Sequence, residues 1–299
     1  MKTQITAVLA VLVMFSAYRL DAQQLPQFSM FQETAYILNP AMGGRNPWFD
    51  AKGINRSQWS GITDAPRTFA MSLDGPLKNP HIGLGGHLFT DNVGPTRRTG
   101  IQLSYAHHFN LNESTRLSFG LSMGAMQFAI DGSKIRLAEE GDPALLNQLQ
   151  SHTVFDATFG VAVHGENWYA GVALPQLLQN QVRLYDSVLP DQNRLEDHYY
   201  LMAGYTYDIT DDWAVEPALL VKVVQPVPVS WELQARAWYR KMVWAGISYR
   251  KSDAIIAMAG YQWNESLTIG YAYDVTTSNL RRHSSGSHEI ILGFRFRQD

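Results

Sequence analysis

The chain has 299 residues, of which 17% are charged and 12% aromatic, and its formal net charge at pH 7 is -3. A net charge this small argues against nucleic acid or a strongly acidic surface as a partner. Cysteine is absent, which excludes disulfides, thiolate metal sites, cysteine nucleophiles and the acylated N-terminal cysteine of a bacterial lipoprotein.

Residues 1–22 predict an export signal. Lys2 is the charged start, Ile5 to Phe15 form the apolar run, and Leu20-Asp21-Ala22 is the expected cleavage site, so the mature chain would begin at Gln23. No later stretch approaches the roughly 18 uninterrupted apolar residues that a spanning helix needs. If the exported protein enters a membrane, only a closed barrel satisfies its backbone there.

Residues 23–47 predict an irregular N-terminal strap or plug on the periplasmic side, because prolines and glycines interrupt any regular element. After it, residues 48–299 alternate between apolar and polar side chains. In the last segment Ile290, Leu292 and Phe294 face one side, and Glu289, Gly293 and Arg295 face the other, with Ile291 as an exception.

This alternation, with aromatic residues toward the segment ends, is typical of an outer-membrane wall. The sequence therefore predicts an all-β fold, a transmembrane outer-membrane β-barrel of about 14 antiparallel strands. The expected strands are 48–59, 66–75, 81–91, 98–109, 115–129, 152–163, 167–175, 196–208, 213–224, 229–240, 242–251, 254–263, 266–274 and 287–297. Pro217 predicts a bulge or weak pairing in its strand.

The connections between the strands alternate in length. Those after even-numbered strands are short, whereas three after odd-numbered strands are long, namely 130–151, 176–194 and 275–286. Outer-membrane barrels have short periplasmic turns and longer outer loops. The pattern predicts that both termini are periplasmic.

Residues with catalytic or metal-binding chemistry are poorly placed for it. His107 and His108 are neighbours in a strand, so they face opposite sides and cannot share a metal ion. Ser287-His288-Glu289 holds the residue types of a hydrolytic triad, but neighbours along a strand cannot form the relay. The glycines at 83, 85 and 86 fit strand curvature better than a phosphate-binding loop.

We therefore predict no catalytic residue, no cofactor and no metal site. Two alternatives stay open. An outer-membrane lipid hydrolase could be assembled from separate strands. A divalent cation could bind at residues 138–142, before an expected loop helix at 143–150.

Several motifs resemble the PorP/SprF family of Bacteroidota outer-membrane proteins. They are Pro26-Gln27-Phe28-Ser29, Asn39-Pro40-Ala41 followed by Gly43, Arg56-Ser57-Gln58-Trp59, Pro66-Arg67-Thr68, Gly83-Leu84-Gly85 followed by Asp91 and Gly94, Gly246-Ile247-Ser248-Tyr249-Arg250, Tyr271-Ala272-Tyr273-Asp274 and Ser285-Gly286-Ser287-His288-Glu289-Ile290. The resemblance runs over nearly the whole mature chain in the family's order.

The resemblance implies a non-enzymatic role in type IX protein secretion and gliding motility. The expected partners are outer-membrane lipid and a secreted cell-surface protein with a C-terminal sorting domain, periplasmic type IX components, or both. No nucleic acid and no small-molecule substrate are expected. A passive outer-membrane pore or transporter for small solutes is the main alternative.

We expect partner binding in the N-terminal motif and on the inward face of the barrel. The inward residues would either stiffen the wall or bind a partner segment inserted into the lumen. Arg97-Arg98 and Arg281-Arg282-His283, near outer strand ends, could meet lipopolysaccharide or a protein. The candidate partner-binding residues are Pro26, Gln27, Phe28, Asn39, Pro40, Arg56, Gln58, Glu216, Lys222, Glu232, Arg236 and Arg250.

Overall fold

A computed structural model describes residues 25–135, 149–184, 195–224 and 227–297. Their strands form a single 15-stranded antiparallel sheet. The strands are β1 (Phe49–Ser57), β2 (Arg67–Pro76), β3 (Ile82–Val93), β4 (Thr96–Asn110), β5 (Arg116–Asp131), β6 (Leu149–His164), β7 (Trp168–Leu174), β8 (His198–Tyr205), β9 (Tyr207–Asp208), β10 (Trp213–Val224), β11 (Val227–Tyr239), β12 (Val243–Arg250), β13 (Ala254–Trp263), β14 (Leu267–Thr276) and β15 (Ser287–Phe296). The short helices are α2 (Ala35–Leu38), η1 (Pro40–Met42), η2 (Gly132–Lys134) and η4 (Asn279–Arg282).

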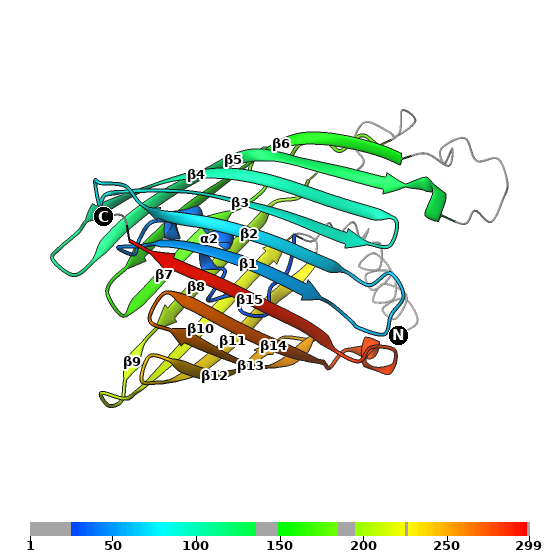
Figure 1. The fold of residues 1–299 in the computed structure, drawn as a ribbon. Helices are drawn as coiled ribbons and strands as arrows, with labels where there is room; N and C mark the ends of the chain where they lie inside the picture. Colours follow the sequence, from blue (N-terminus) through cyan, green and yellow to red (C-terminus); the bar gives the residue numbers. More distant parts are fainter. Residues whose placement is uncertain (1–24, 136–148, 185–194, 225–226, 298–299) are drawn as a thin grey trace, which may run out of the picture.

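The sheet closes into a barrel (Figure 1). The last strand pairs with the first from Phe49↔Phe296 to Ser57↔His288, and β10 also pairs with β11, so no strand in the described part of the chain is left as an edge. Thr206 interrupts one barrel strand into β8 and β9, which makes fourteen strands around the barrel. The prediction of about 14 antiparallel strands is confirmed.

The interruption lies opposite Pro217. The ladder between β10 and β8 ends at Ala218↔Gly204 and resumes with β9 at Val215↔Tyr207. Successive strand N–H groups point to alternate neighbours, so the missing donor of Pro217 affects one ladder and leaves the pairing with Ala235 intact. The prediction of weak pairing is confirmed, but a bulge at Pro217 is wrong, because the register shift in this strand falls between Lys222 and Val224.

The outward face of the wall is apolar and the inward face largely polar. Leu103 is 70% exposed and Phe155 is 72% exposed on the outside, while Arg56 and Glu289 are buried on the inside. A face of this kind is matched to hydrocarbon. His107 and His108 face opposite sides as predicted, since His107 stacks on Phe109 outside and His108 is buried inside.

The two ends of the barrel differ. We call the end that carries the connections β1–β2, β5–β6, β7–β8 and β14–β15 the long-loop end, and the opposite end the short-turn end. Residues 136–148, which include the whole predicted cation site and most of the predicted loop helix, lie outside the described residues. Leu149 and Gln150 belong to β6, so a helix through residue 150 is wrong.

Residues 25–47 lie inside the barrel, and Figure 1 shows α2 enclosed by the strands. We call them the lumenal segment. Its first residue, Leu25, lies near Phe89, Met126 and Pro175 in the half toward the long-loop end. From there the segment runs to the short-turn end and enters β1, beside the end of β15. The end of β15 and the start of β1 therefore lie side by side at the short-turn end.

Two apolar clusters hold the lumenal segment against the wall. In one, Phe28 and Met30 pack with Ile291, Ile256 and Trp244. This explains why Ile291 breaks the polar pattern of the inward face. In the other, Phe31, Leu38 and Met42 are joined by strand residues of β6 to β10. Full burial of a large apolar side chain contributes about 1.5–3 kcal/mol. None of the helices in the described residues has the length and apolar composition to cross a membrane.

Candidate functional site

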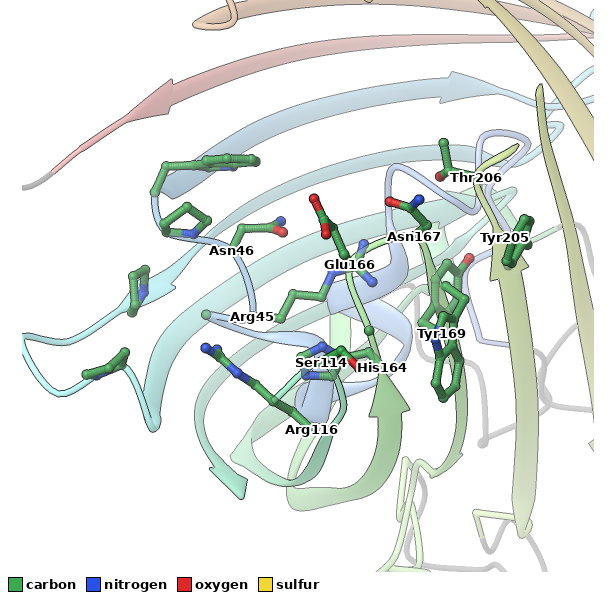
Figure 2. A pocket seen from close by; sticks show the side chains of 18 of the residues that line it. Arg45, Asn46, Ser114, Arg116, His164, Glu166, Asn167, Tyr169, Tyr205 and Thr206 are labelled. Atoms are coloured by element: carbon green, nitrogen blue, oxygen red, sulfur yellow. The ribbon is translucent and has the colours of Figure 1, made fainter. Parts of the chain in front are cut away.

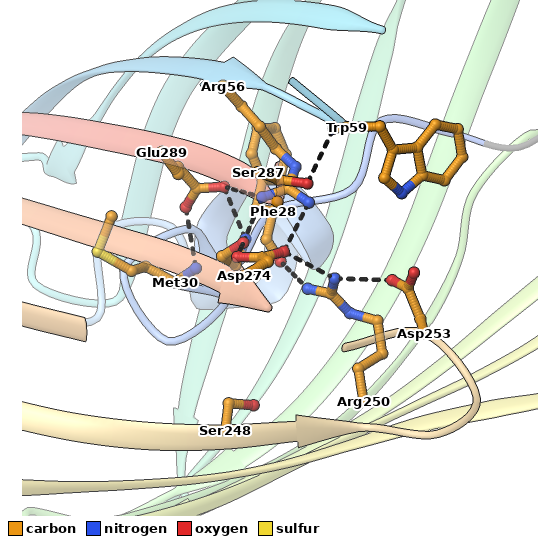
Figure 3. A network of polar contacts seen from close by, with 12 residues as sticks. Phe28, Met30, Arg56, Trp59, Ser248, Arg250, Asp253, Asp274, Ser287 and Glu289 are labelled. Carbon is orange, nitrogen blue, oxygen red and sulfur yellow. Dashed lines mark hydrogen bonds and ion pairs between the residues drawn. The ribbon is translucent and has the colours of Figure 1, made fainter. Parts of the chain in front are cut away.

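The first fixed point of the lumenal segment is the turn Phe28–Met30, held near the long-loop end (Figure 3). The Glu289 carboxylate accepts hydrogen bonds from the backbone N–H of Ser29 at 2.6 Å and of Met30 at 2.9 Å. The Ser29 hydroxyl donates to Asp274 at 2.6 Å. Two backbone donors of an irregular segment are thereby satisfied by one strand carboxylate, as a buried backbone requires.

Two arginines complete this group. Arg56 forms ion pairs with Asp274 at 2.8 Å and Glu289 at 3.5 Å, and it also donates to the Ser29 hydroxyl. Arg250 pairs with Glu232 at 2.7 Å and Asp274 at 3.2 Å, and donates to the Phe28 carbonyl at 3.2 Å. We call Arg56, Glu232, Arg250, Asp274 and Glu289 the Arg56 clamp. All five side chains are buried, so loss of one member leaves an uncompensated charge.

The second fixed point is Glu33. Its carboxylate pairs with Arg236 at 2.5 Å and with Lys52 at 3.2 Å, and Lys52 also donates to the Glu33 carbonyl at 2.7 Å. Arg236 in turn pairs with Glu216 at 2.7 Å, and Glu216 accepts from the Trp238 indole N–H at 2.7 Å. We call Glu33, Lys52, Glu216 and Arg236 the Glu33 clamp.

The charges around Glu33 decide its protonation. Burial by itself would raise the pKa of this carboxyl, but the positive charges of Lys52 and Arg236 outweigh it and hold the pKa well below its usual range. Glu33 is therefore ionised at neutral pH, and the clamp keeps its charge pairing there.

The third fixed point is η1, which rests on strands that carry glycines on their inner face. The Asn39 side chain caps η1 by accepting from Ala41 N–H at 2.9 Å, and donates to the carbonyls of Val161 at 3.2 Å and Val172 at 3.3 Å. A Cβ at Gly160 would collide with the Asn39 amide, and one at Gly120 would collide with the backbone of Ala41. These glycines let η1 approach the wall.

The segment then turns across β2 to β5. His108 Nε2 lies 3.1 Å from the Gly43 carbonyl and donates to it, while its Nδ1 accepts from the Ser118 hydroxyl at 2.6 Å. His164 lies 3.0 Å from the same hydroxyl. Ser118 and His108 are fully buried against Gly43, so this serine and its histidines anchor the segment. Asp74 adds a bond of 2.9 Å from Gly44 N–H.

The structure brings most of the predicted partner-binding residues together, in two groups. Arg56, Glu232 and Arg250 meet Phe28 in the Arg56 clamp, whereas Glu216 and Arg236 belong to the Glu33 clamp. Asn39 and Pro40 start η1. Lys222 instead lies over the Tyr200 ring at 5.3 Å, Pro26 lines a small hollow beside Leu25, and Gln58 lies at the long-loop rim.

Sequence reasoning missed several of the residues that hold the segment: Ser29, Glu33, Lys52, Asp274, Glu289 and His108. The alternation placed Glu289 on the polar face without a partner, and Asp274 appeared only within a family motif. The signal that could have found the path of the segment was the run of glycines on inward faces. Gly83, read as easing curvature, instead makes room for Gly43, because a Cβ there would collide with the Gly43 carbonyl.

Comparison with protein families decides the identity. Residues 20–294 match the type IX secretion system membrane protein family PorP/SprF. The chain belongs to the PorP/SprF family. It is an outer-membrane β-barrel of the type IX secretion system, and the family is one of membrane components rather than of enzymes.

Solved structures similar to this PorP/SprF chain share its fold. A TodX ΔS2S3 mutant, a monoaromatic hydrocarbon channel, is 10% identical with a TM-score of 0.51, covering 88% of this chain and 94% of that one. The outer-membrane protein Omp33 of Acinetobacter baumannii is 10% identical with a TM-score of 0.48, covering 85% and 100%. At these identities the first likeness speaks for the barrel fold alone. A search of curated proteins found no match.

Metal chemistry finds no support in the described residues. Within residues 25–135, 149–184, 195–224 and 227–297, no three histidine or acidic side chains are grouped as metal ligands.

Proposed function

We propose that this protein is a non-conducting barrel of the type IX secretion system that holds a protein partner, with its own N-terminal segment closing the lumen. The partner would be a secreted cell-surface protein with a C-terminal sorting domain or a periplasmic component of the machinery. The observation that carries the proposal is the lumenal segment itself, which is fixed at three levels by buried charges, a capping asparagine and inward glycines.

The orientation belongs to the same proposal. The short-turn end would face the periplasm and the long-loop end the cell exterior, as barrel loop lengths favour. After cleavage behind Ala22, the mature chain would begin two residues before Leu25, and Leu25 itself would lie in the half of the lumen toward the cell exterior. The segment would then be in place before or while the barrel closes around it. Its Ser29 and Met30 bind Glu289 of the last strand, and its Glu33 pairs with Lys52 of the first strand.

A solute pore needs a continuous water-filled path, and the clamps leave the segment little freedom to provide one. Neutralising either clamp would leave buried charges unpaired, at about 3–5 kcal/mol for each broken pair. Because the clamps hold the lumenal segment firmly in place, we favour a closed barrel that binds a protein over an open channel for solutes.

The test is conductance in planar bilayers together with copurification from outer membranes in mild detergent. The intact protein should be electrically silent and should copurify with a secreted surface protein or periplasmic component. Deletion of residues 24–40, with barrel insertion checked separately, should open a conducting lumen and abolish export of the partner. Steady conductance of the intact protein would favour the solute pore instead, and unchanged export after the deletion would remove the segment from the mechanism.

A further inference from the structure

The lumen opens at the short-turn end into a cavity of about 980 Å³ (Figure 2). The end of the lumenal segment, the turns after β2, β4 and β6, and the break between β8 and β9 surround it. We call this cavity the vestibule; its lining includes Arg45, Arg116, His164, Glu166, Trp168 and Tyr169.

Two arginines in the vestibule differ from those of the clamps. The Arg45 guanidinium lies 5.1 Å from the centroid of the Tyr169 ring. Neither it nor the Arg116 guanidinium makes a hydrogen bond or an ion pair with another residue in the part of the chain that the structure describes. Both are only partly exposed. By contrast, Arg56, Arg236 and Arg250 each face at least two carboxylates.

Within the described residues, none of the acidic side chains that line the cavity forms an ion pair with Arg45 or Arg116. Glu216 is held by Arg236 and Trp238, while Glu113 and Glu166 lie exposed on the turns. Burial lowers the pKa of Arg45, although an arginine so shifted still carries its charge at neutral pH. Arg45 and Arg116 are therefore partly buried positive charges that have no ion-pair partner among the described residues.

The vestibule also contains polar atoms suited to a peptide. The Tyr169 hydroxyl, the Trp48 indole N–H and the Gln32 side-chain oxygen are buried and have no hydrogen-bond partner in the described residues. A buried polar atom that stays without a hydrogen bond destabilises the protein, so a ligand that supplies the bond is favoured. Aromatic side chains beside arginines are the residue types that dominate peptide and protein recognition. Trp48, Trp168, Tyr169 and Tyr205 all line the vestibule.

We propose that the vestibule binds an acidic peptide segment of a protein partner, whose carboxylates pair with Arg45 and Arg116 while its chain packs on Trp168 and Tyr169. This deepens the proposed function, on which it rests for the choice of a protein as ligand. The structure assigns the chemistry of the contact: charge-assisted hydrogen bonds from two guanidinium groups in a recessed, aromatic-lined site.

The experiment is calorimetric titration of the purified full-length mature protein, in detergent, with short capped peptides. One peptide alternates glutamate and alanine, a second replaces glutamate by glutamine, and a third by lysine. The glutamate peptide should bind, with affinity that falls as salt rises, and the other two should not. R45Q and R116Q should each weaken binding about tenfold, the value of one hydrogen bond to a charged group.

The matched control is Arg240→Gln. Arg240 lies on a turn of the same end but already pairs with Asp212 at 3.1 Å, so its loss should leave the titration unchanged. Because Arg45 belongs to the lumenal segment, bilayer conductance of R45Q should be recorded and should stay silent. Equal binding of the lysine peptide, or unchanged affinity in the R45Q/R116Q double variant, would overturn the proposal.

A competition titration with inorganic phosphate tests whether the vestibule binds any anion. Displacement of the glutamate peptide by phosphate at equal concentration would identify a general anion site and would also overturn the peptide assignment. These titrations do not involve secretion. A failure here with intact copurification and export would leave the proposed function standing, while binding here with no partner recovered would contradict only the secretion role.

Discussion

Ser29 and Glu289 are 260 residues apart in the chain, yet the Ser29 N–H donates to the Glu289 carboxylate at 2.6 Å. The contact joins the start of the lumenal segment to the strand that closes the barrel on β1. Closure and plugging are therefore linked, because β15 can satisfy its buried carboxylate fully only when the segment is in the lumen.

Glu289→Ala should release the part of the lumenal segment around Ser29 and Met30 from the barrel wall. The substitution leaves the N–H groups of Ser29 and Met30 without an acceptor and removes one carboxylate from Arg56, at a cost of about 3–5 kcal/mol. We expect a lower unfolding temperature and discrete channel openings in planar bilayers. Arg240→Ala is the control, since an ion pair exposed to solvent, such as Arg240 with Asp212, should contribute little to stability. A silent and equally stable E289A would show that the clamp does not hold the segment.

Glu33 gives a prediction about pH. Its pKa is lowered in the folded protein by Lys52 and Arg236, so its contribution to stability is present above the pKa of the unfolded chain, 4.5, and is lost as pH falls toward the folded value. E33Q should therefore be less stable than the wild type by a constant amount between about pH 6 and 8. The difference should shrink below about pH 4.5, as measured by thermal unfolding in detergent. A difference that grew on acidification would contradict the sign of this shift.

The inward glycines can be tested by adding side chains. Gly120→Val places a branched side chain where the backbone of Ala41 lies, so η1 must move away from β5. Overpacking of this kind costs about 1–3 kcal/mol. We expect lower thermal stability and higher protease sensitivity of the segment. Gly53→Ala is matched to it, since a Cβ at Gly53 meets nothing within 4 Å, and it should behave as the wild type.

The wall could be predicted from the sequence because its physics is local. Alternation of residues such as Leu292 and Gly293 with period two, and the turns between segments, determine strands, faces and the barrel class. Even Ile291, which broke the pattern, was visible as an exception. The inward direction of Arg56, Glu232 and Arg250 followed from the same alternation.

The course of the lumenal segment could not be predicted in this way. Its contacts join residues such as Ser29 and Glu289, or Asn39 and Gly160, whose pairing depends on the closed barrel and leaves no periodic signal in residues 25–47. The inward glycines were a weak sign of where the lumenal segment runs. In the sequence, however, a glycine that eases strand curvature cannot be distinguished from one against which a helix packs. The two clamps likewise appeared as one undivided set of inward charges.

Two substitutions at Asn39 distinguish the contribution of the η1 cap from that of the contacts between Asn39 and the barrel wall. Its Oδ1 accepts from Ala41 N–H, while its Nδ2 donates to the carbonyls of Val161 and Val172. Asn39→Ala loses all three bonds and should cost about 1–2 kcal/mol. Asn39→Asp keeps the cap but sets a carboxylate oxygen against two carbonyl oxygens in a fully buried site, so it should be the more destabilising of the two. Thermal unfolding of both variants in the same detergent measures the order, and N39D more stable than N39A would mean that the cap outweighs the contacts to β6 and β7.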